Sequence, residues 1–451
     1  MNTLDDQHRY VASRRRFLRE GVIGAGALTG LASLDFNALA AGEAGESIDF
    51  WQYKYASGQP GDKALGDAAR RFKAQTGITV NITFKSAEGI QQAVTAAAQA
   101  HNGFDAMLWW SGPTARDQGR LGNVVSLDGK IPQSTFAHKA NRLAQSYAGK
   151  TYGLTFTGGT YFLVYNATLL KKAGLSDDAI PPADEDPLSW NAFLDICEKV
   201  KKNTSVKAPL MWANKEGYFN EWWFYTLQAQ AFDTAKQIQD INLGPKSWVN
   251  PQIVRAMEAW KTLYDRKLFY PGGEVIAYEQ HVRQLASGQV ALSAYFDVQG
   301  ATAEARKIFG ASNIRFSKIP AHRTDTKQWN ALCNDVNSLY VSSWTKKQKA
   351  ALAWLAFLTT PKQMTAWAKA TQEVPGDDRW TPNVISDPQT RLLYKGLSEK
   401  NTVYPYDFVT QNQYSSLLKN GILYLNGKWS AEKLLQDFDK ADKQFAKKQG
   451  G

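Results

Sequence analysis

The chain has 451 residues, of which 43% are hydrophobic and 21% are charged, and its formal net charge at pH 7 is +11. This composition is that of a folded globular protein and excludes a disordered chain, while the length predicts more than one hydrophobic core. The positive charge would suit a nucleic-acid partner, but the lysine pairs are scattered over separate predicted helices without a basic stripe, so we expect no nucleic-acid partner.

The first forty residues have the pattern of an export signal. Arg14 and Arg15 precede a Gly-rich, weakly apolar run from residue 21 to residue 34, and Ala38-Leu39-Ala40 offers a small-x-small cleavage site. The pattern predicts a twin-arginine signal peptide over residues 1–40, cleaved near Ala40, and passage through the Tat export machinery. No later stretch approaches the roughly 20 apolar residues that cross a bilayer. We therefore expect an exported protein that is soluble in the periplasm.

The mature chain begins with alternating strands and helices. The expected order is strand, helix, strand, helix, strand, at residues 47–53, 61–76, 78–84, 87–101 and 104–110. This order predicts a parallel sheet with right-handed crossovers, and the loops at the carboxyl ends of such strands line a ligand site. The rule places residues 51–55 and 109–111 at the rim of that site.

The segment from Tyr147 to Leu175 is expected to organise the rest of the chain. Two β-rich runs, residues 151–157 and 161–166, flank Gly158-Gly159, and a helix is expected from Ala167 to Ala173. The glycine pair either turns a hairpin or lets the chain pass from one lobe to another.

The order of these pieces resembles the crossover of the extracellular solute-binding proteins of ABC importers, in the sugar-binding group called family 1. The positions that match the phrase of that family are Gly149, Lys150, Tyr152, Gly153, Leu154, Tyr165, Asn166, Ala173, Gly174 and Leu175. Thr155 stands where the family often has proline. The resemblance implies that this segment carries the chain from lobe I to lobe II.

The remaining elements continue the resemblance up to Lys447. Helices are expected at residues 190–201, 218–232, 251–268, 280–286, 346–358, 361–371, 415–425 and 430–447, and strands at 289–295 and 330–342. The last strand returns the chain to lobe I, and a third crossing is expected near Leu397 to Pro405. The predicted fold is α/β and two-lobed, of the periplasmic binding protein type (type II-like). Each lobe is expected to be a mainly parallel sheet flanked by helices, and hinge strands join the lobes. Lobe I comprises residues 41–157 and 333–396, and lobe II comprises 158–332 and 397–451.

The candidate ligand-binding residues are aromatic rings and polar side chains near the expected strand ends. Rings cover the apolar C–H faces of a sugar, and polar groups bond its hydroxyls. The rings are Trp51, Trp109, Trp110, Trp222, Trp223, Tyr295, Trp380, Tyr404 and Tyr406, and the polar groups are Gln52, Lys54, Asp297, Asn334, Asp335, Asn337 and Arg379. Trp222 and Trp223 lie about 100° apart on a helix, so one of them is expected to belong to the core. Core packing and turn chemistry are the alternative interpretations for the other rings and for the Asn/Asp group.

Motifs of catalysis are missing from the sequence. The five histidines are isolated, and neither a nucleophile elbow nor a phosphate-binding loop occurs. Neighbouring acidic residues in one loop do not give the opposed carboxylates of a glycosidase. We expect no catalytic residue, no metal and no cofactor. Two alternatives remain: an exported carbohydrate-active enzyme (hydrolase or lyase), and a ferric- or anion-binding protein on the same fold.

The resemblance implies a periplasmic, monomeric substrate-binding protein. It would capture a sugar or a related polyhydroxy solute between its two lobes and deliver it to the membrane permease of an ABC transporter, by a Venus-flytrap closure. Cys197, in a helix, and Cys333, in a distant strand, either form a bridge in the periplasm or remain two small buried side chains. The sequence leaves the solute open among monosaccharide, oligosaccharide, polyol and acidic sugar.

Overall fold

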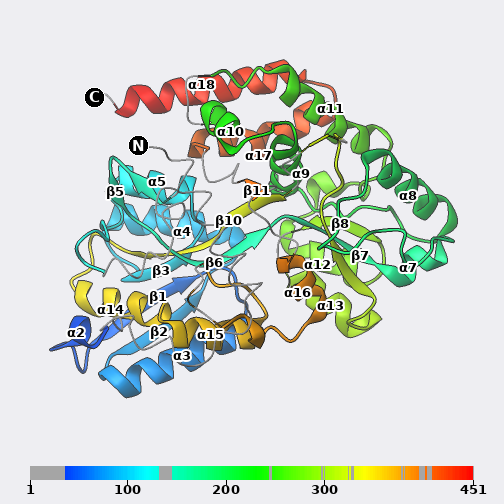
Figure 1. Ribbon diagram of the computed structural model, residues 1–451. Coiled ribbons are helices and arrows are strands. Elements are labelled where there is room, and N and C mark those ends of the chain that lie inside the picture. The colour runs from blue at the N-terminus through cyan, green and yellow to red at the C-terminus, as the bar shows by residue number, and fades with distance from the viewer. Residues whose placement is uncertain are drawn as a thin grey trace. The chain divides into compact units, whose positions relative to one another are not determined.

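The structure is a computed structural model that describes residues 36–131, 145–242, 246–295, 298, 300–323, 325–326, 330–376, 379, 381–395, 402–403 and 409–449. The chain divides into two compact units. Unit 1 contains residues up to Gly158 together with Asn334–Ser386, and unit 2 contains Gly159–Cys333 together with the residues from Asp387 onward. The chain therefore passes from one unit to the other three times (Figure 1).

Unit 1 is an α/β unit around a mixed sheet. Its strands are β1 (Ser47–Gln52), β2 (Thr79–Phe84), β3 (Ala106–Trp109), β4 (Ser146–Tyr147), β5 (Lys150–Thr151) and most of β6 (Leu154–Thr160) and β10 (Asn330–Val341). Its helices are α2 (Phe36–Ala40), α3 (Pro60–Thr76), α4 (Ala87–Ala100), α5 (Pro113–Arg120), α14 (Gln348–Leu358), α15 (Pro361–Thr371) and the 3-10 helix η5 (Pro382–Val384). The sheet order is β11-β10-β3-β1-β2, where β11 is Thr402–Val403 and β6 lies beside β10.

The first three strands are parallel, as the alternating sequence predicts. β1 pairs in parallel with both β2 and β3, and β10 closes the other side of β3 in the antiparallel direction. Side chains alternate across the sheet: Ile48 and Phe50 face the core beneath α3 and α14, whereas Met107 and Trp109 face α4 and α5. Figure 1 shows these two helical layers on opposite faces of the sheet.

Short polar side chains begin several helices where the sequence predicts a start. The hydroxyl of Ser86 accepts a hydrogen bond from the backbone of Gly89 at the start of α4, and Ser189 does the same for Ala192 at the start of the next unit's α8 (Trp190–Asn203). Gly77 ends α3 with φ of 77°, the left-handed conformation that favours glycine.

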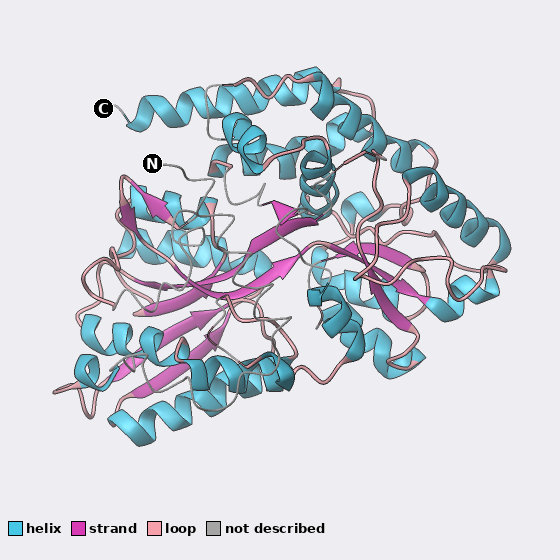
Figure 2. Cartoon of the chain, viewed as in Figure 1, coloured by secondary structure: helices cyan, strands magenta, loops and turns pink. Residues whose placement is uncertain are grey.

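Unit 2 combines a small sheet with many helices (Figure 2). Its strands are β7 (Phe162–Asn166), β8 (Leu292–Tyr295), β9 (Ile314–Ser317) and β11 (Thr402–Val403). Its helices are α7 (Ala167–Lys172), α8, α9 (Tyr218–Gln230), α10 (Ala235–Asn242), α11 (Pro251–Asp265), η3 (Gly273–Val275), η4 (Tyr278–Gln280), α12 (His281–Ala286), α13 (Gly300–Phe309), α16 (Pro388–Lys395), α17 (Gln411–Leu425) and α18 (Ala431–Gln449). Helices α11, α17 and α18 pack around α9 and each other, while α13 and α16 pack on β9.

The sheet of unit 2 differs from the mainly parallel sheet that we expected for each lobe. Its order is β8-β7-β9, and both pairs are antiparallel. Parallel pairing in the described part of unit 2 is short: Asn330 and Ala331 of β10 pair with β11, and isolated bridges join Leu210 to Phe269 and Leu292, and Ser189 to Ala321. The α/β class is confirmed, but the sequence of a short run such as residues 289–295 does not indicate whether the strand pairs in parallel or antiparallel.

The crossings resolve two expectations about the chain path. Gly158 and Gly159 lie inside β6, which continues from unit 1 into unit 2, so the pair does not turn a hairpin. The third crossing falls at Ser386–Asp387, earlier than residues 397–405. The reason is that α16 packs on β9, and Asp387 forms an ion pair of 3.0 Å with Arg306 of α13.

Helix α2 lies inside the stretch predicted as a signal peptide, while Arg14 and Arg15 lie outside the described residues. The ring of Phe36 contacts Phe357 edge-on with 5.1 Å between centroids, and Ala40 is buried. Cys197 is a buried free thiol of α8, and burial raises its pKa well above the ordinary value. The side chain of Cys333 lies outside the described part. Where the structure describes the chain, no helix is both long and apolar enough to cross a membrane.

Candidate functional site

Unit 1 gathers aromatic rings where β1 and β3 end. Trp110 follows the last residue of β3, and Tyr53 follows the last residue of β1. Their half-buried rings meet edge-to-face with 5.4 Å between centroids, and the buried ring of Trp109 lies 5.6 Å behind Trp110. Because parallel strands end at the same edge of the sheet, residues far apart in sequence form one apolar surface here.

Trp51 belongs to the same face of the sheet. Its ring lies 5.1 Å from that of Phe104, and the ammonium group of Lys85 lies 4.5 Å above it, a cation–π contact. The ring is half-buried, so part of it packs against the core of this face and part of it is exposed at the edge of the core.

Two polar residues predicted for the ligand instead organise the end of β1. The side-chain amide of Gln52 donates to the backbone oxygen of Tyr55 at 2.6 Å and accepts from its backbone nitrogen at 2.8 Å. The ammonium of Lys54 lies 2.9 Å from the carboxylate of Glu373, and both side chains are less than a tenth exposed. The hydroxyl of Tyr55 donates to the same carboxylate at 2.6 Å. A buried charge requires such partners, so these groups fix the turn that carries Tyr53.

The remaining predicted polar residues have structural contacts or lie outside the described part. Asn337 is fully buried and donates to the hydroxyl of Thr157 at 2.8 Å. Arg379 donates to the backbone oxygen of Thr359 at 3.0 Å. Asn334 and Asp335 belong to β10, but their side chains are outside the description. Residues not described at all are Asp297, Trp380, Tyr404 and Tyr406.

Unit 2 builds a second ring cluster between α9 and the end of β8. Trp222 meets Tyr295 edge-on at 5.4 Å between centroids and Phe219 at 4.2 Å. Tyr278 adds a half-buried ring 6.2 Å from Trp222. We call Phe219, Trp222, Tyr278, His281 and Tyr295 the ring cluster.

His281 links two members of this cluster. Its ring stacks on Tyr278 with 4.3 Å between centroids, and its Nε2 lies 2.7 Å from the hydroxyl of Tyr295. Its Nδ1 bonds the backbone oxygen of Tyr278. The sequence indicates only an isolated histidine, solvated or capped, whereas the side chain is buried and faces Tyr295 of β8.

A buried carboxylate adjoins the ring cluster. Glu221 precedes Trp222 on α9 and is 5% exposed. The hydroxyls of Tyr161 and Tyr414 each donate to one of its oxygens, the second at 2.7 Å. Tyr161 immediately precedes β7, and Phe162 of β7 pairs with Tyr295 of β8. The carboxylate and the ring cluster therefore lie at the same edge of the unit 2 sheet.

Trp223 points elsewhere. Its ring is fully buried against Trp190, Phe193 and Phe269, with centroid distances of 6.3, 5.9 and 6.2 Å. Both adjacent tryptophans are buried, Trp222 within the ring cluster and Trp223 against these three rings.

Sequence reasoning missed Tyr53, Tyr161, Glu221, Tyr278, His281 and Tyr414. Two of them carried a signal: Tyr53 lies in the rim predicted for residues 51–55, and Glu221 is the single acidic residue of the aromatic-rich helix YFNEWWFYTLQAQ. A carboxylate within a buried helix must find partners. The sequence does not show which residues these partners are, because Tyr161 and Tyr414 lie near opposite ends of the unit 2 sequence.

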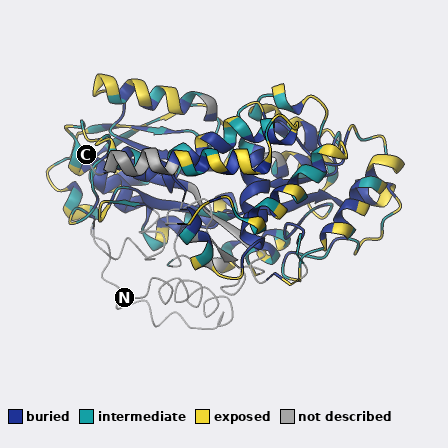
Figure 3. Ribbon diagram, turned by 90° about the horizontal axis from the view of Figure 1, so that it is seen from above, coloured by how far each residue is buried: buried dark blue, intermediate teal, exposed yellow. Residues whose placement is uncertain are grey.

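Figure 3 shows the dark blue, buried strands and the exposed outer faces of the surrounding helices.

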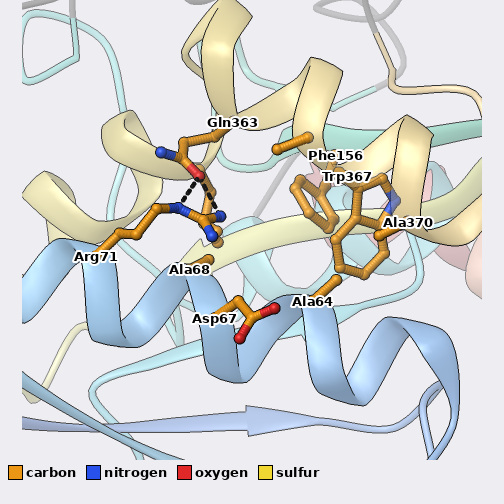
Figure 4. Close-up of a pocket in the computed structure, with 10 residues that line it drawn as sticks. Ala64, Asp67, Ala68, Arg71, Phe156, Gln363, Trp367 and Ala370 are labelled. Atoms are coloured by element: carbon orange, nitrogen blue, oxygen red, sulfur yellow. Dashed lines mark hydrogen bonds between the residues drawn. The ribbon is translucent and has the colours of Figure 1, made fainter. Parts of the chain in front are cut away.

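A small cavity between α3 and α15 of unit 1 is not large enough for a sugar. Its volume is about 50 Å³, and the rings of Phe156 and Trp367 line it (Figure 4). Ligand sites for organic molecules commonly measure about 300–1,000 Å³. The guanidinium of Arg71 donates to the side-chain oxygen of Gln363 at 2.6 and 3.1 Å beside it. The cavity therefore belongs to the packing of the two helices.

The described residues form no metal centre. Among the residues that it covers, no three His, Cys, Asp or Glu side chains gather closely enough to hold an ion. The features that stand out among these residues are rings and hydrogen-bonding groups.

Two α/β units joined by three crossings are the arrangement that the resemblance of the crossover segment implies. Residues 67–391 match the family described as bacterial extracellular solute-binding protein. The match covers more than half of the chain, and the chain belongs to this family. The family consists of binding proteins and not of enzymes, and its members act outside the cytoplasm. No curated protein sequence matches the chain significantly.

Solved structures share the fold at low identity. A chitin oligosaccharide binding protein superposes with a TM-score of 0.73 at 17% identity, covering 89% of this chain and 99% of that one. An ABC transporter solute binding protein from Thermotoga lettingae, bound with α-D-tagatose, gives 0.70 at 16% identity and covers 88% and 99%. The GacH receptor of Streptomyces glaucescens, solved unliganded and with acarbose, gives 0.69 at 17% identity and covers 89% and 98%. At such identities the likeness establishes the fold.

Proposed function

We propose that the chain is the substrate-binding protein of an ABC importer and that its solute is a sugar or a related polyhydroxy molecule. The observation that carries the proposal is the pair of half-buried rings, Tyr53 and Trp110, at the carboxyl edge of the unit 1 sheet. Rings match the apolar faces of a sugar, and the polar groups match its hydroxyls. The solved relatives named above bind sugars, which supports the same class of solute here.

The unit 1 rings by themselves offer an aromatic surface to a sugar. Tyr53 and Trp110 present half-buried faces next to each other, and Trp51 lies on the same side of the sheet. Lys54, by contrast, is engaged with Glu373, so we no longer assign it to the solute. Aromatic contact supplies affinity with little loss of side-chain entropy, because each ring is already packed.

The proposal includes the finer predictions from the sequence. The precursor would leave the cytoplasm through the Tat machinery, be cleaved near Ala40 and act as a periplasmic monomer. Cleavage there would remove α2 and its Phe36 contact with Phe357. Mass spectrometry of the exported protein measures the new N-terminus. An N-terminus upstream of Phe36 would show that α2 is a permanent part of unit 1.

A thermal-shift screen tests the function. Neutral monosaccharides, disaccharides, polyols and sugar acids are each added to the purified mature protein. A ligand at 100 times its Kd stabilises the folded state by about 2.7 kcal/mol, so a bound sugar raises the Tm by several degrees. We expect a small, related group of sugars to raise it. A screen in which amino acids or metal ions raise the Tm and no sugar does would contradict the proposal.

A further inference from the structure

A buried carboxylate holds the turn that carries Tyr53, one of the two half-buried rings of unit 1. Both oxygens of Glu373 are engaged: one lies 2.9 Å from the ammonium of Lys54, and the other accepts the hydroxyl proton of Tyr55 at 2.6 Å. The side chains of Lys54 and Glu373 are 8% and 5% exposed, and Tyr55 is 1% exposed. Tyr53 is therefore followed directly by two residues that the same carboxylate holds inside unit 1.

The other end of the same turn is fixed by the side chain of Gln52. Its amide forms two hydrogen bonds with the backbone of Tyr55, so Tyr53 and Lys54 lie between two fixed residues. A backbone that is held at both ends keeps the side chain that it carries in one place. The ring of Tyr53 is thereby kept next to the ring of Trp110.

The segment that carries Glu373 is itself bonded to a crossing strand. The backbone nitrogen of Gly158 donates to the backbone oxygen of Val374 at 2.9 Å. The backbone nitrogen of Gly376 donates to the backbone oxygen of Phe156 at 2.8 Å. Both bonds join the segment to β6, the strand on which the chain leaves unit 1. One short segment therefore bonds the crossing strand through its backbone and the ring-bearing turn through its carboxylate.

The burial of this ion pair indicates a role beyond stability. Moving two charges out of water costs desolvation energy, and apolar side chains of similar size often stabilise a core as well or better. Either charge without the other is strongly unfavourable in a buried place, so the pair tolerates only conformations that keep both partners together. Glu373 and Lys54 therefore favour one conformation of the turn over all others.

We propose that Glu373 is a positioning residue of the solute site: through Lys54 and Tyr55 it holds the ring of Tyr53 beside Trp110, and it thereby sets the affinity for a sugar. The inference rests on the proposed function and adds to it a residue that acts without touching the solute. A sugar that meets a ring already in place does not have to order the turn, and the cost of that ordering would otherwise weaken binding.

The first arm of the test observes the ring without any solute. Fluorotyrosine replaces Tyr53, and its fluorine NMR signal is recorded in the wild-type protein and in Glu373→Gln. We expect one sharp signal in the wild type and a broadened or divided signal in the variant, because the ammonium of Lys54, left without a counter-charge, moves toward water and takes the turn with it. Fluorotyrosine at Tyr270, in unit 2, is expected to give the same signal in both proteins. An unchanged signal at position 53 in folded Glu373→Gln would overturn the inference.

The second arm measures affinity by calorimetry with glucose, galactose, mannose and maltose. For each of these sugars that binds the wild type, we expect a Kd at least about tenfold higher in Glu373→Gln. Tyr53→Ala is expected to weaken binding by a smaller factor in Glu373→Gln than in the wild type, because the carboxylate acts through that ring. A merely structural role would lower the Tm and leave the two factors equal.

Equal factors, or an unchanged Kd in folded Glu373→Gln, would overturn this inference alone. Binding of no sugar by the wild type would overturn it together with the proposed function. Asp117→Asn is the matched control, because it breaks another carboxylate–cation pair of unit 1, 2.6 Å from Arg120 and outside the turn. We expect it to leave both the fluorine signal and the Kd unchanged.

Lys54→Ala combined with Glu373→Ala keeps the test decisive if Glu373→Gln does not fold. The double variant leaves no unpaired charge in the core and removes the link between the turn and the segment beside β6. We expect the same broadened fluorine signal and the same loss of affinity. A wild-type signal and a wild-type Kd in the double variant would show that the ion pair does not position Tyr53.

Discussion

Neighbouring side chains of α9 serve different purposes in this protein. Glu221 accepts two tyrosine hydroxyls, Trp222 contacts Tyr295 and Phe219, and Trp223 fills the core beside Trp190. The helix is buried on nearly every side, so each position is defined by the element that it faces. Asn220, on the same helix, bonds backbone oxygens of α17.

This division predicts different consequences for the two tryptophans. Trp223→Ala would remove a fully buried indole and lower the free energy of unfolding by about 3–5 kcal/mol, as for other buried aromatic residues. Affinity for the sugar identified in the screen would change little once the variant is folded. Trp222→Ala would lower that affinity at least about tenfold, equivalent to about 1.4 kcal/mol.

Urea denaturation and calorimetry on the same samples separate the two effects. Trp223→Phe is the control, because it keeps a ring in the core and is expected to cost less stability. Intact affinity in Trp222→Ala would place this ring in the core only and remove it from the site.

Charged and polar residues near strand ends were the least predictable part of the site. Gln52 and Lys54 follow the pattern of ligand contacts, yet they bond Tyr55 and Glu373. Glu373 lies more than 300 residues away in sequence, so no local pattern could reveal this ion pair. Glu221 was the opposite case: its position in an aromatic run indicated a buried partner but not which one.

At the scale of elements, the segment that follows β9 is anchored to the end of α9. The backbone nitrogen of His322 donates to the side chain of Gln230 at 3.0 Å, and Thr326 and Arg323 donate to backbone oxygens at the same helix end. The ring Nε2 of His322 lies 3.0 Å from the backbone oxygen of Leu227. Burial lowers the pKa of His322 from 6.5 to about 4.

This lowered pKa predicts a loss of stability in acid. Between pH 6.5 and about 4 the imidazole of His322 binds a proton in the unfolded chain but not in the folded protein. The free energy of unfolding therefore falls as the pH falls. The full effect is at most roughly 3 kcal/mol, at 1.36 kcal/mol per pKa unit. His322→Gln keeps a donor for Leu227 and cannot be protonated.

Urea denaturation at several pH values measures the difference. We expect the free energy of unfolding of wild type to fall relative to that of His322→Gln as the pH is lowered from 6.5 to 4. Parallel pH curves for the two proteins would show that His322 does not take part in acid destabilisation.

Elements were predicted well where their patterns were long. The strands and helices of residues 47–110 have the expected order and parallel pairing, because alternation and helical periodicity act locally. The direction of pairing in unit 2 was wrong, since β7, β8 and β9 are short and their partners are far apart in sequence. The place of α16 likewise depends on its contacts with β9 and α13, which sequence alone does not give.

At the scale of the whole molecule, the family match and the division into two units agree with the resemblance in the crossover segment. That segment is informative because Gly158-Gly159 continue a strand through a change of unit. Surface lysines also form local ion pairs; for example, Lys307 pairs with Glu304. Such surface pairs contribute little to stability.

The central claim is that the protein binds a polyhydroxy solute reversibly and leaves it unchanged. Equilibrium dialysis of the mature protein against the sugars that raise its Tm, followed by chromatography of the released solute, tests this claim most directly. The account predicts saturable binding at one site per chain and full recovery of the intact sugar. Recovery of shortened, oxidised or otherwise altered sugar, or failure to retain any sugar, would contradict it.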